Sequence, residues 1–283
     1  MKRLFKNKKI LLSLIVLMGL SGCMAQDLVI SLKTPFSDMW VGSNSWFEAL
    51  FVYPLAQALN FLAPYTGVLM AIILVTIFVK LLTFGLTVKS TVATQKMQTL
   101  QPELNKIQQK YAGLTDNESK MKMSTEMNDL YKKHNINPFG SIATLFIQFP
   151  VIIAMYQAVQ HAVVVKEGAL FGYALSNSPQ KAITDGQWFV VVIFVLMGVS
   201  QFVSMKLPTW LNKARAKKQP IRLGEKQTKA PNTDMMMYTS MVMILFFAFT
   251  WPTAMSLYWM VSSIGQIIQT YYIQKAYIEK EDA

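Results

Sequence analysis

Long apolar runs separated by polar segments dominate the chain, and their lengths predict membrane-spanning helices. An α-helix rises about 1.5 Å per residue, so roughly 20 apolar residues cross a ~30 Å hydrocarbon core. The stretch 235–273 is too long for one such helix, and we divide it at Pro252, because proline ends or kinks a helix. We expect an all-α polytopic membrane protein with five transmembrane helices. The predicted spans are about 64–86, 139–163, 188–206, 235–250 and 252–273.

Residues 44–62 are apolar as well, but polar residues and Pro54 interrupt them. Their apolar positions recur at steps of three and four, which is typical of an amphipathic helix lying in the membrane interface. Trp46 and Tyr53 would anchor this helix among the lipid headgroups. The alternative is a full span, against which Pro54 argues.

The polar segment 88–137 carries two further amphipathic repeats. Apolar positions step by three and four over 97–111 and again over 123–130. Thr115 followed by Glu118 has the spacing of a capping box and predicts the start of the second helix. We expect a helical hairpin here, and the alternative is an unstructured charged loop.

The basic residues gather in two of the segments between spans. The net charge is +12, from 27 Lys and Arg against 15 Asp and Glu. Segments 87–138 and 206–232 each carry eight Lys or Arg, whereas 24–63 carries one and 164–187 carries two. Basic loops stay in the cytoplasm, so the hairpin and the C-terminus are expected inside and the N-terminal side outside.

The N-terminus has the three parts of a secretory signal: a basic start, a short apolar stretch and a small-residue site. Its residues Leu20-Ser21-Gly22-Cys23 resemble the lipobox of bacterial lipoproteins, whose cysteine becomes the lipidated, palmitate-bearing first residue. We expect a signal peptide over 1–22, lipidation of Cys23, an extracytoplasmic linker over 23–43 and a multi-pass protein of the bacterial plasma membrane. The alternative is a buried Cys23 in an uncleaved helix.

Lys80 places a charge inside the first predicted span, on a face that it shares with Thr76 and Thr83. Insertion scales put the cost of such a charge at about 2.5–3.5 kcal/mol. The predicted spans contain no Asp or Glu that could compensate it. We expect a hydrated space between helices in which Lys80 attracts an anionic group.

Polar side chains of the other spans are expected to line the same space. They are Gln148, Gln201, Trp259 and Gln266. One alternative is that Lys80 extends to the membrane interface, and another is that the polar residues serve only as hydrogen-bond partners between helices. The histidines, His134 and His161, have no partner at metal-ligand spacing, and no catalytic motif occurs. We therefore expect no enzyme, no cofactor and no metal.

Three stretches resemble the YidC family of membrane-protein insertases. Residues 96–111 resemble its first cytoplasmic helix, 135–159 its second span with an Asn-Pro pair and Gln-x-Pro, and 251–269 its last span. The lipoprotein signal is similar to that of the short form in Gram-positive bacteria. The family usually has arginine where Lys80 stands, so the charge is kept without the planar fork of a guanidinium.

The resemblance implies an insertase and chaperone core over 64–275, followed by a short cytoplasmic tail over 276–283. Such a core takes nascent membrane proteins into a hydrophilic groove open to cytosol and lipid, and releases their helices into the bilayer. Lys80 would attract acidic client segments. The Sec translocon and the ribosome are candidate partners, and no small-molecule substrate is expected. The residues alone leave two alternatives: a small-anion transporter or channel, and a structural lipoprotein without a groove.

Overall fold

The computed structural model describes residues 28–40, 46–137, 140–218 and 233–279. These residues are predominantly helical, as expected for the all-α class. The exception among them is a short antiparallel hairpin of β1 (Ala169–Leu170) and β2 (Tyr173–Ala174). The expected signal peptide and Cys23 lie outside the described residues.

The chain packs as two compact units. The first comprises Met1–Ala71 with Pro150–Ser176, and the second comprises Ile72–Phe149 with Asn177–Ala283. Two long helices, α3 (Val68–Thr99) and α6 (Gly140–His161), contribute residues to both units. All of the candidate site residues except Cys23 belong to the second unit.

The first unit contains the segment for which an interfacial helix is expected. Its other helical elements are η2 (Phe36–Trp40), η3 (Glu48–Val52), α2 (Tyr53–Thr66) and α7 (Val163–Lys166). Pro54 does not break the helix, because the π-helical turn η3 keeps helical backbone at Val52 and runs directly into α2 at Tyr53. Exposed aromatic rings gather on this unit, with Trp46 against Phe51 at 6.2 Å between ring centroids.

An extended residue, Ile30, is fixed to the first unit by backbone hydrogen bonds. Its N–H donates to the His161 carbonyl at 2.7 Å, and its own carbonyl accepts from the Val163 N–H at 3.0 Å. Buried Asn60 donates to that carbonyl at 2.6 Å and accepts from the Val164 N–H at 3.3 Å. Asn60 thereby gives the Val164 N–H an acceptor and adds a second donor to the Ile30 carbonyl.

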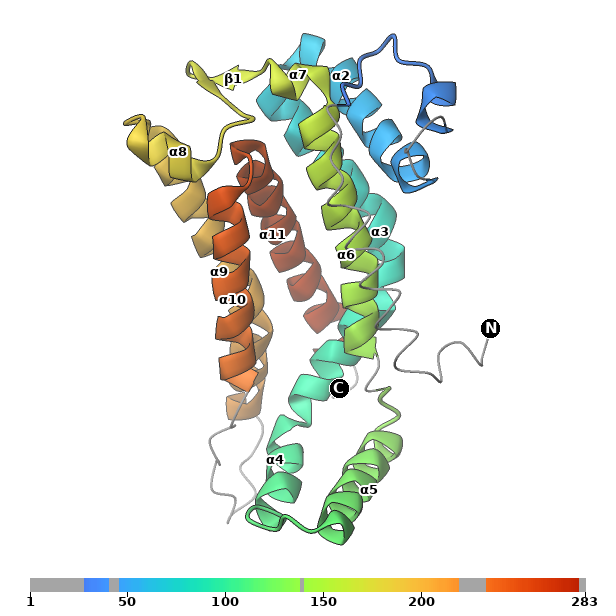
Figure 1. Cartoon of the computed structure of the whole chain (residues 1–283). Helices are drawn as coiled ribbons and strands as arrows, with labels where there is room; N and C mark the ends of the chain where they lie inside the picture. The colour runs from blue at the N-terminus through green and yellow to red at the C-terminus, as the bar shows by residue number, and fades with distance from the viewer. Residues whose placement is uncertain (1–27, 41–45, 138–139, 219–232, 280–283) are drawn as a thin grey trace. The chain divides into compact units, whose positions relative to one another are not determined.

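In the second unit three long helices run side by side (Figure 1). They are α9 (Trp188–Lys218), α10 (Thr233–Thr250) and α11 (Thr253–Ile273), the last followed by one π-helical turn, η4 (Gln274–Ile278). Gly198 lets α10 approach α9 closely, since a Cβ there would lie 3.3 Å from Leu245. Side chains of α11, including Met255, Leu257 and Tyr258, are buried and belong to the core of this unit.

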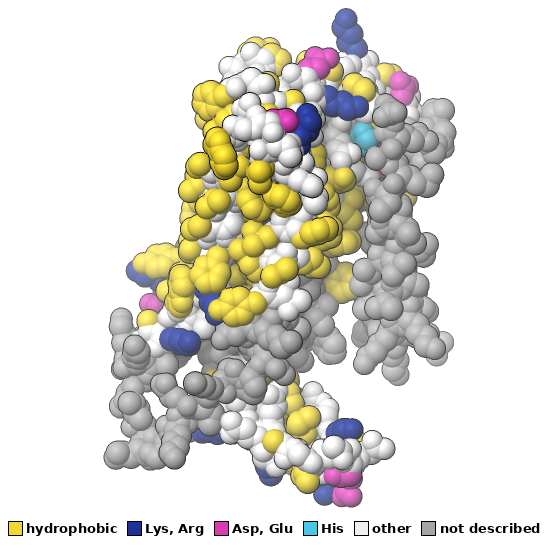
Figure 2. All heavy atoms as spheres, turned by 60° about the vertical axis from the view of Figure 1, so that its left-hand side comes forward, with side chains coloured by type: hydrophobic (Ala, Val, Ile, Leu, Met, Phe, Trp, Pro, Cys, Tyr) yellow, Lys and Arg dark blue, Asp and Glu magenta, His cyan; other side chains and the backbone are white. Residues whose placement is uncertain are grey.

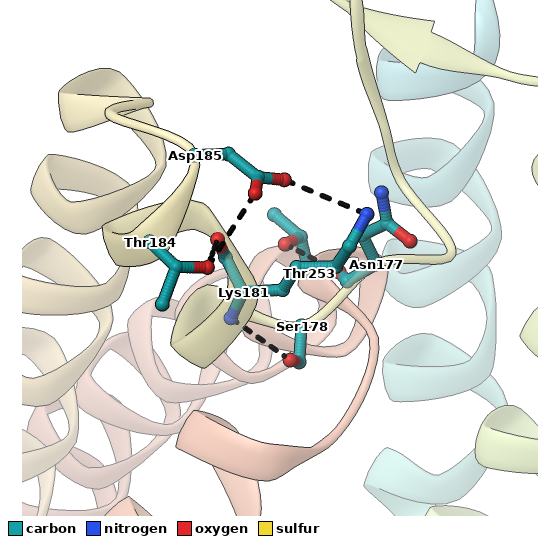
Figure 3. A network of polar contacts seen from close by, with 6 residues as sticks. All are labelled: Asn177, Ser178, Lys181, Thr184, Asp185 and Thr253. Atoms are coloured by element: carbon teal, nitrogen blue, oxygen red, sulfur yellow. Dashed lines mark hydrogen bonds and ion pairs between the residues drawn. The ribbon is translucent and has the colours of Figure 1, made fainter.

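A polar network ties the start of α11 to α8 (Pro179–Thr184), as Figure 3 shows. The Asn177 carbonyl accepts from both the N–H and the hydroxyl of Thr253, each at 2.8 Å. Ser178 caps α8 by accepting from the Lys181 N–H at 3.3 Å, and the Lys181 ammonium lies 3.5 Å from Asp185. These contacts hold the beginning of α11, where Pro252 leaves the first backbone donors without helical acceptors.

By length and composition, two described helices could cross a membrane: Val68–Gln98 and Trp188–Ala214. A third apolar helix, Met237–Thr250, is shorter. Figure 2 shows hydrophobic side chains gathered on the face that carries α9 and α10. Exposed members of this patch are Val192, Val195, Leu196, Val199, Val242, Met243 and Phe246. An apolar exterior of this kind is stable in lipid, and the count of five spans stays a prediction.

The helix that covers most of the first predicted span begins later than residue 64. Residues 64–66 end α2, and α3 begins at Val68, because Gly67 adopts a φ of +81° that favours glycine and breaks the helix between them. At its other end α3 runs on to Thr99, well beyond residue 86.

The segment after α3 forms two helices, α4 (Gln101–Lys110) and α5 (Asn117–Lys133), which pack against one another. Leu100, Leu104 and Ile136 form a small core between them, and Lys110 pairs with Glu126. The residue that caps α5 is not Thr115. Its neighbour Asp116 accepts from the Ser119 N–H at 2.7 Å, since Asp116 is the last residue with extended backbone before the helix.

Candidate functional site

Lys80 projects from α3 onto α11, where a glycine makes room for it. A Cβ at Gly265 would lie 3.7 Å from both Cγ and Cδ of Lys80. The aliphatic part of the lysine therefore packs against the bare backbone of α11, and the side chain stays partly exposed. Among the described residues no carboxylate lies within ion-pair distance of its ammonium. The Lys80 ammonium therefore lies next to α11 without a carboxylate partner among the described residues.

The threonines on the Lys80 face are bonded to their own helix. Thr76 donates its hydroxyl to the Ile72 carbonyl at 2.7 Å, and Thr83 donates to the Val79 carbonyl at 2.8 Å. Such bonds satisfy the hydroxyl hydrogens and leave the oxygen lone pairs as acceptors. Thr76 is fully buried, whereas Thr83 is partly exposed. Thr83 also donates to the backbone carbonyl of Lys80 at 3.3 Å, but among the described residues no hydrogen bond joins either hydroxyl to the Lys80 ammonium.

Two of the predicted glutamines reach α11 from other helices. The Ser263 hydroxyl donates to Gln201 Oε1 of α9 at 2.6 Å. Gln148 of α6 donates to the Tyr258 hydroxyl at a longer 3.4 Å. Both glutamines are partly exposed, so each combines one contact to α11 with access from outside the core.

The two predicted residues of α11 itself differ in exposure. Trp259 is only 7% exposed and stacks on Trp251 with ring centroids 5.5 Å apart, so most of its ring is covered by protein. Gln266 is partly exposed and directly follows Gly265. It has no hydrogen-bond partner in the part of the chain that the structure describes.

Further polar contacts join α3 to α11 at residues of α3 that follow Lys80 along the helix, whereas Thr76 precedes it. Gln269 donates to the Thr87 hydroxyl at 3.0 Å and approaches that of Thr91 at 3.5 Å. The polar stripe on α3 therefore continues past Lys80 for several turns, and Gln269 of α11 contacts it through its side-chain amide. Over the described residues, no group of three or more His, Cys, Asp and Glu side chains is arranged to hold a metal ion.

Several of these contacts were not identified from the sequence. Gly265 and Ser263 were missed because a glycine and a serine inside a span have no distinctive pattern of their own. A glycine in the middle of an apolar helix was the available signal, since it costs helix stability unless something packs against it. Tyr258 was not singled out in the sequence either, and it is the hydrogen-bond partner of Gln148.

The pattern of the family described as "60Kd inner membrane protein" matches residues 61–281. Membrane protein insertase MisCA of Bacillus subtilis (strain 168) is 30% identical over 274 residues, which cover 96% of this chain and 92% of that protein.

Two further relatives have similar identity and carry the name YidC. Membrane protein insertase YidC of Mycoplasmopsis pulmonis is 31% identical over 236 residues, or 80% of this chain and 38% of that longer protein. Membrane protein insertase YidC 1 of Streptococcus pyogenes serotype M1 is 31% identical over 227 residues, or 80% of this chain and 73% of that protein.

Proposed function

Because the chain belongs to the 60Kd inner membrane protein family, we propose that it is a membrane protein insertase, as its relatives are named. Membership confirms the resemblance to YidC insertases that the sequence indicated. The relatives are named for membrane protein insertion and not for a catalysed reaction, which supports a non-enzymatic role. Its clients are newly made membrane proteins, and its surroundings are the lipid bilayer.

The proposed mechanism centres on Lys80 of α3, whose ammonium has no carboxylate partner among the described residues. A client presents a short polar segment, and Lys80 attracts its acidic residues into a hydrophilic groove lined by Gln148, Gln201 and Gln266. At 4 Å and an effective dielectric constant of about 20, a carboxylate and an ammonium attract by about 4 kcal/mol before desolvation is subtracted. The apolar helix of the client then transfers into lipid, which drives the process.

One observation supports this mechanism more than any other. The Lys80 stem rests against Gly265 while its ammonium has no carboxylate partner among the described residues, although insertion of a charge there is costly. A cation kept at such cost is expected to bind something that arrives from outside the chain. The partly exposed glutamines beside α11 supply further hydrogen-bonding groups for a polar segment.

The proposed function also implies a topology for the chain in the membrane. We place five spans across the bacterial plasma membrane, with a lipid anchor on Cys23 outside. The α4–α5 pair, whose segment is rich in lysine, then lies in the cytoplasm with the C-terminus. There it would receive clients, with the ribosome and the Sec translocon as candidate partners.

The test uses the purified chain in liposomes that contain no other protein. Two single-span clients differ only in the outer segment, which carries Asp and Glu in one and Asn and Gln in the other. Lys80→Arg should insert both clients normally. Lys80→Ala should slow the acidic client by about tenfold or more, equivalent to about 1.4 kcal/mol, because it removes part of the ~4 kcal/mol attraction. The neutral client should change little.

Lys89→Ala is the matched control, since it removes an exposed lysine from the same helix. Equal insertion of the acidic client by the wild type, Lys80→Ala and Lys80→Glu would remove Lys80 from the mechanism. Liposomes that insert neither client, yet pass small anions in a Lys80-dependent way, would favour the transporter or channel alternative.

A further inference from the structure

A cluster of amide side chains lies in the second unit beyond Lys80, where the later parts of α3, α9 and α11 meet. Its members are Gln95 and Gln98 of α3, Asn212 of α9 and Gln274, the first residue of η4. We call these four residues the amide cluster. None of them belongs to the site proposed for clients.

Direct contacts link α3 to both of the other helices at this cluster. Gln95 donates from Nε2 to the Thr270 carbonyl at 3.2 Å, and the backbone N–H of Gln274 donates to the same carbonyl. Gln98, one turn after Gln95, accepts from Asn212 Nδ2 at 3.4 Å. Gln95 is therefore next to the backbone of Gln274, and Gln98 is next to Asn212.

The register of α9 against α11 places Asn212 and Gln274 at equivalent positions along the two helices. Both helices begin beside α8 and run in the same direction, and Gln201 bonds to Ser263 across them. Advancing eleven residues along each helix leads to Asn212 and Gln274. Eleven residues make about three full turns, so these side chains return to the same faces as the bonded pair.

Several polar atoms of the amide cluster are buried without a hydrogen-bond partner among the described residues. Gln95 and Gln274 are each 1% exposed. Gln95 Oε1, Asn212 Oδ1 and both amide atoms of Gln274 have no hydrogen-bond partner in the described part of the chain. The helix widens into a π turn at Gln274, a feature that recurs at functional sites because it redirects side chains. Buried polar atoms are almost always bonded, so these atoms indicate a ligand.

We propose that the amide cluster binds ordered water, which bridges α3, α9 and α11. The unpaired atoms are three acceptor oxygens and one donor amide, and water can donate to the first and accept from the second. The atoms are sealed from solvent, so a peptide or lipid headgroup does not fit, whereas buried water characteristically occupies such polar sites. All the oxygens are neutral amide oxygens, which makes a cation the less suitable occupant.

The first experiment depends on the sign of a stability change. Gln274→Met keeps the length of the side chain but removes both amide atoms. If water satisfies these atoms, the substitution breaks the bridge and the apparent Tm falls, by about 2–4 °C or more. If the atoms are truly unpaired, the substitution removes two buried unbonded groups and Tm rises, which would overturn the proposal. Gln109→Met, at an exposed helical glutamine of the same unit, should leave Tm unchanged.

The second measurement does not depend on a variant that folds. A high-resolution experimental structure of the wild-type chain should show solvent density within hydrogen-bond distance of the Gln274 amide. Direct pairing of Gln274 with Gln95 or Asn212, or a dry void between them, would reject the water site. A wild-type Tm that changes when sodium is replaced by potassium or choline would assign the site to a cation and would also reject it.

Discussion

The contact between Lys80 and Gly265 can be tested by enlarging the glycine in steps. A Cβ at this position would lie 3.7 Å from Cγ and Cδ of Lys80 and 4.0 Å from Cε. These are ordinary van der Waals distances, so Gly265→Ala fits without moving the lysine. We expect this variant to insert acidic clients at the wild-type rate.

A larger side chain does not fit beside the lysine. A carbon–carbon bond is about 1.5 Å long, so a γ-carbon directed at Lys80 would come within about 2.2 Å of its stem. Gly265→Leu must therefore push Lys80 away from α11. Overpacking of this kind costs about 1–3 kcal/mol, which corresponds to about a 5- to 150-fold loss if the lysine must return to its place to meet the client.

The assay compares insertion rates of the acidic and neutral clients in liposomes. Gly265→Leu should slow the acidic client within that range and affect the neutral client less. Gly85→Leu is the matched control, because a Cβ at Gly85 of α3 meets nothing within 4 Å. If Gly265→Leu and Gly265→Ala insert the acidic client equally well, Gly265 does not position Lys80 and the reasoning is refuted.

Three further predictions concern contacts outside the Lys80–Gly265 pair. Ser263→Ala should lower stability by about 0.6 kcal/mol, the typical size of an interhelical hydrogen bond in membranes, and a double-mutant cycle with Gln201→Leu should recover that coupling; a coupling of zero would contradict the 2.6 Å bond. Asn60→Leu should destabilise the chain by about 1–3 kcal/mol, measured as a fall in apparent Tm, because it leaves the Val164 N–H without its acceptor and removes one of the two donors to the Ile30 carbonyl. The Lys110 ammonium donates a hydrogen bond to Glu126 and so holds the pKa of that carboxyl below its ordinary 4.5. This tie therefore stabilises the α4–α5 pair above pH 4.5 and is lost as pH falls through the lower folded pKa. The protection of α5 amides against hydrogen exchange, corrected for the intrinsic exchange rate at each pH, should fall on acidification, and Glu126→Gln should lack that part of the pH dependence; identical pH profiles would rule the tie out.

Some helix boundaries could be predicted from the sequence, because they depend on residues that are close together along the chain. Pro252 separates α10 from α11, since its ring cannot continue a helix. Gly67 was not recognised as a helix end, although its positive φ sets the boundary between α2 and α3. Its signal was weak, because an isolated glycine is tolerated inside helices.

The sequence by itself determined that the chain is helical and apolar, that its basic residues are segregated, and that Lys80 has no acidic partner in the predicted spans. These follow from composition and from the period of the helix, which short stretches of sequence contain in full. Which side chains meet was decided only by the tertiary structure. Lys80 and Gly265, or Gln95 and Thr270, are separated by more than half of the chain, and periodicity assigns each to a face without naming the face opposite. The register between helices is set by how their whole surfaces pack, so the partners appear only once every helix is in place.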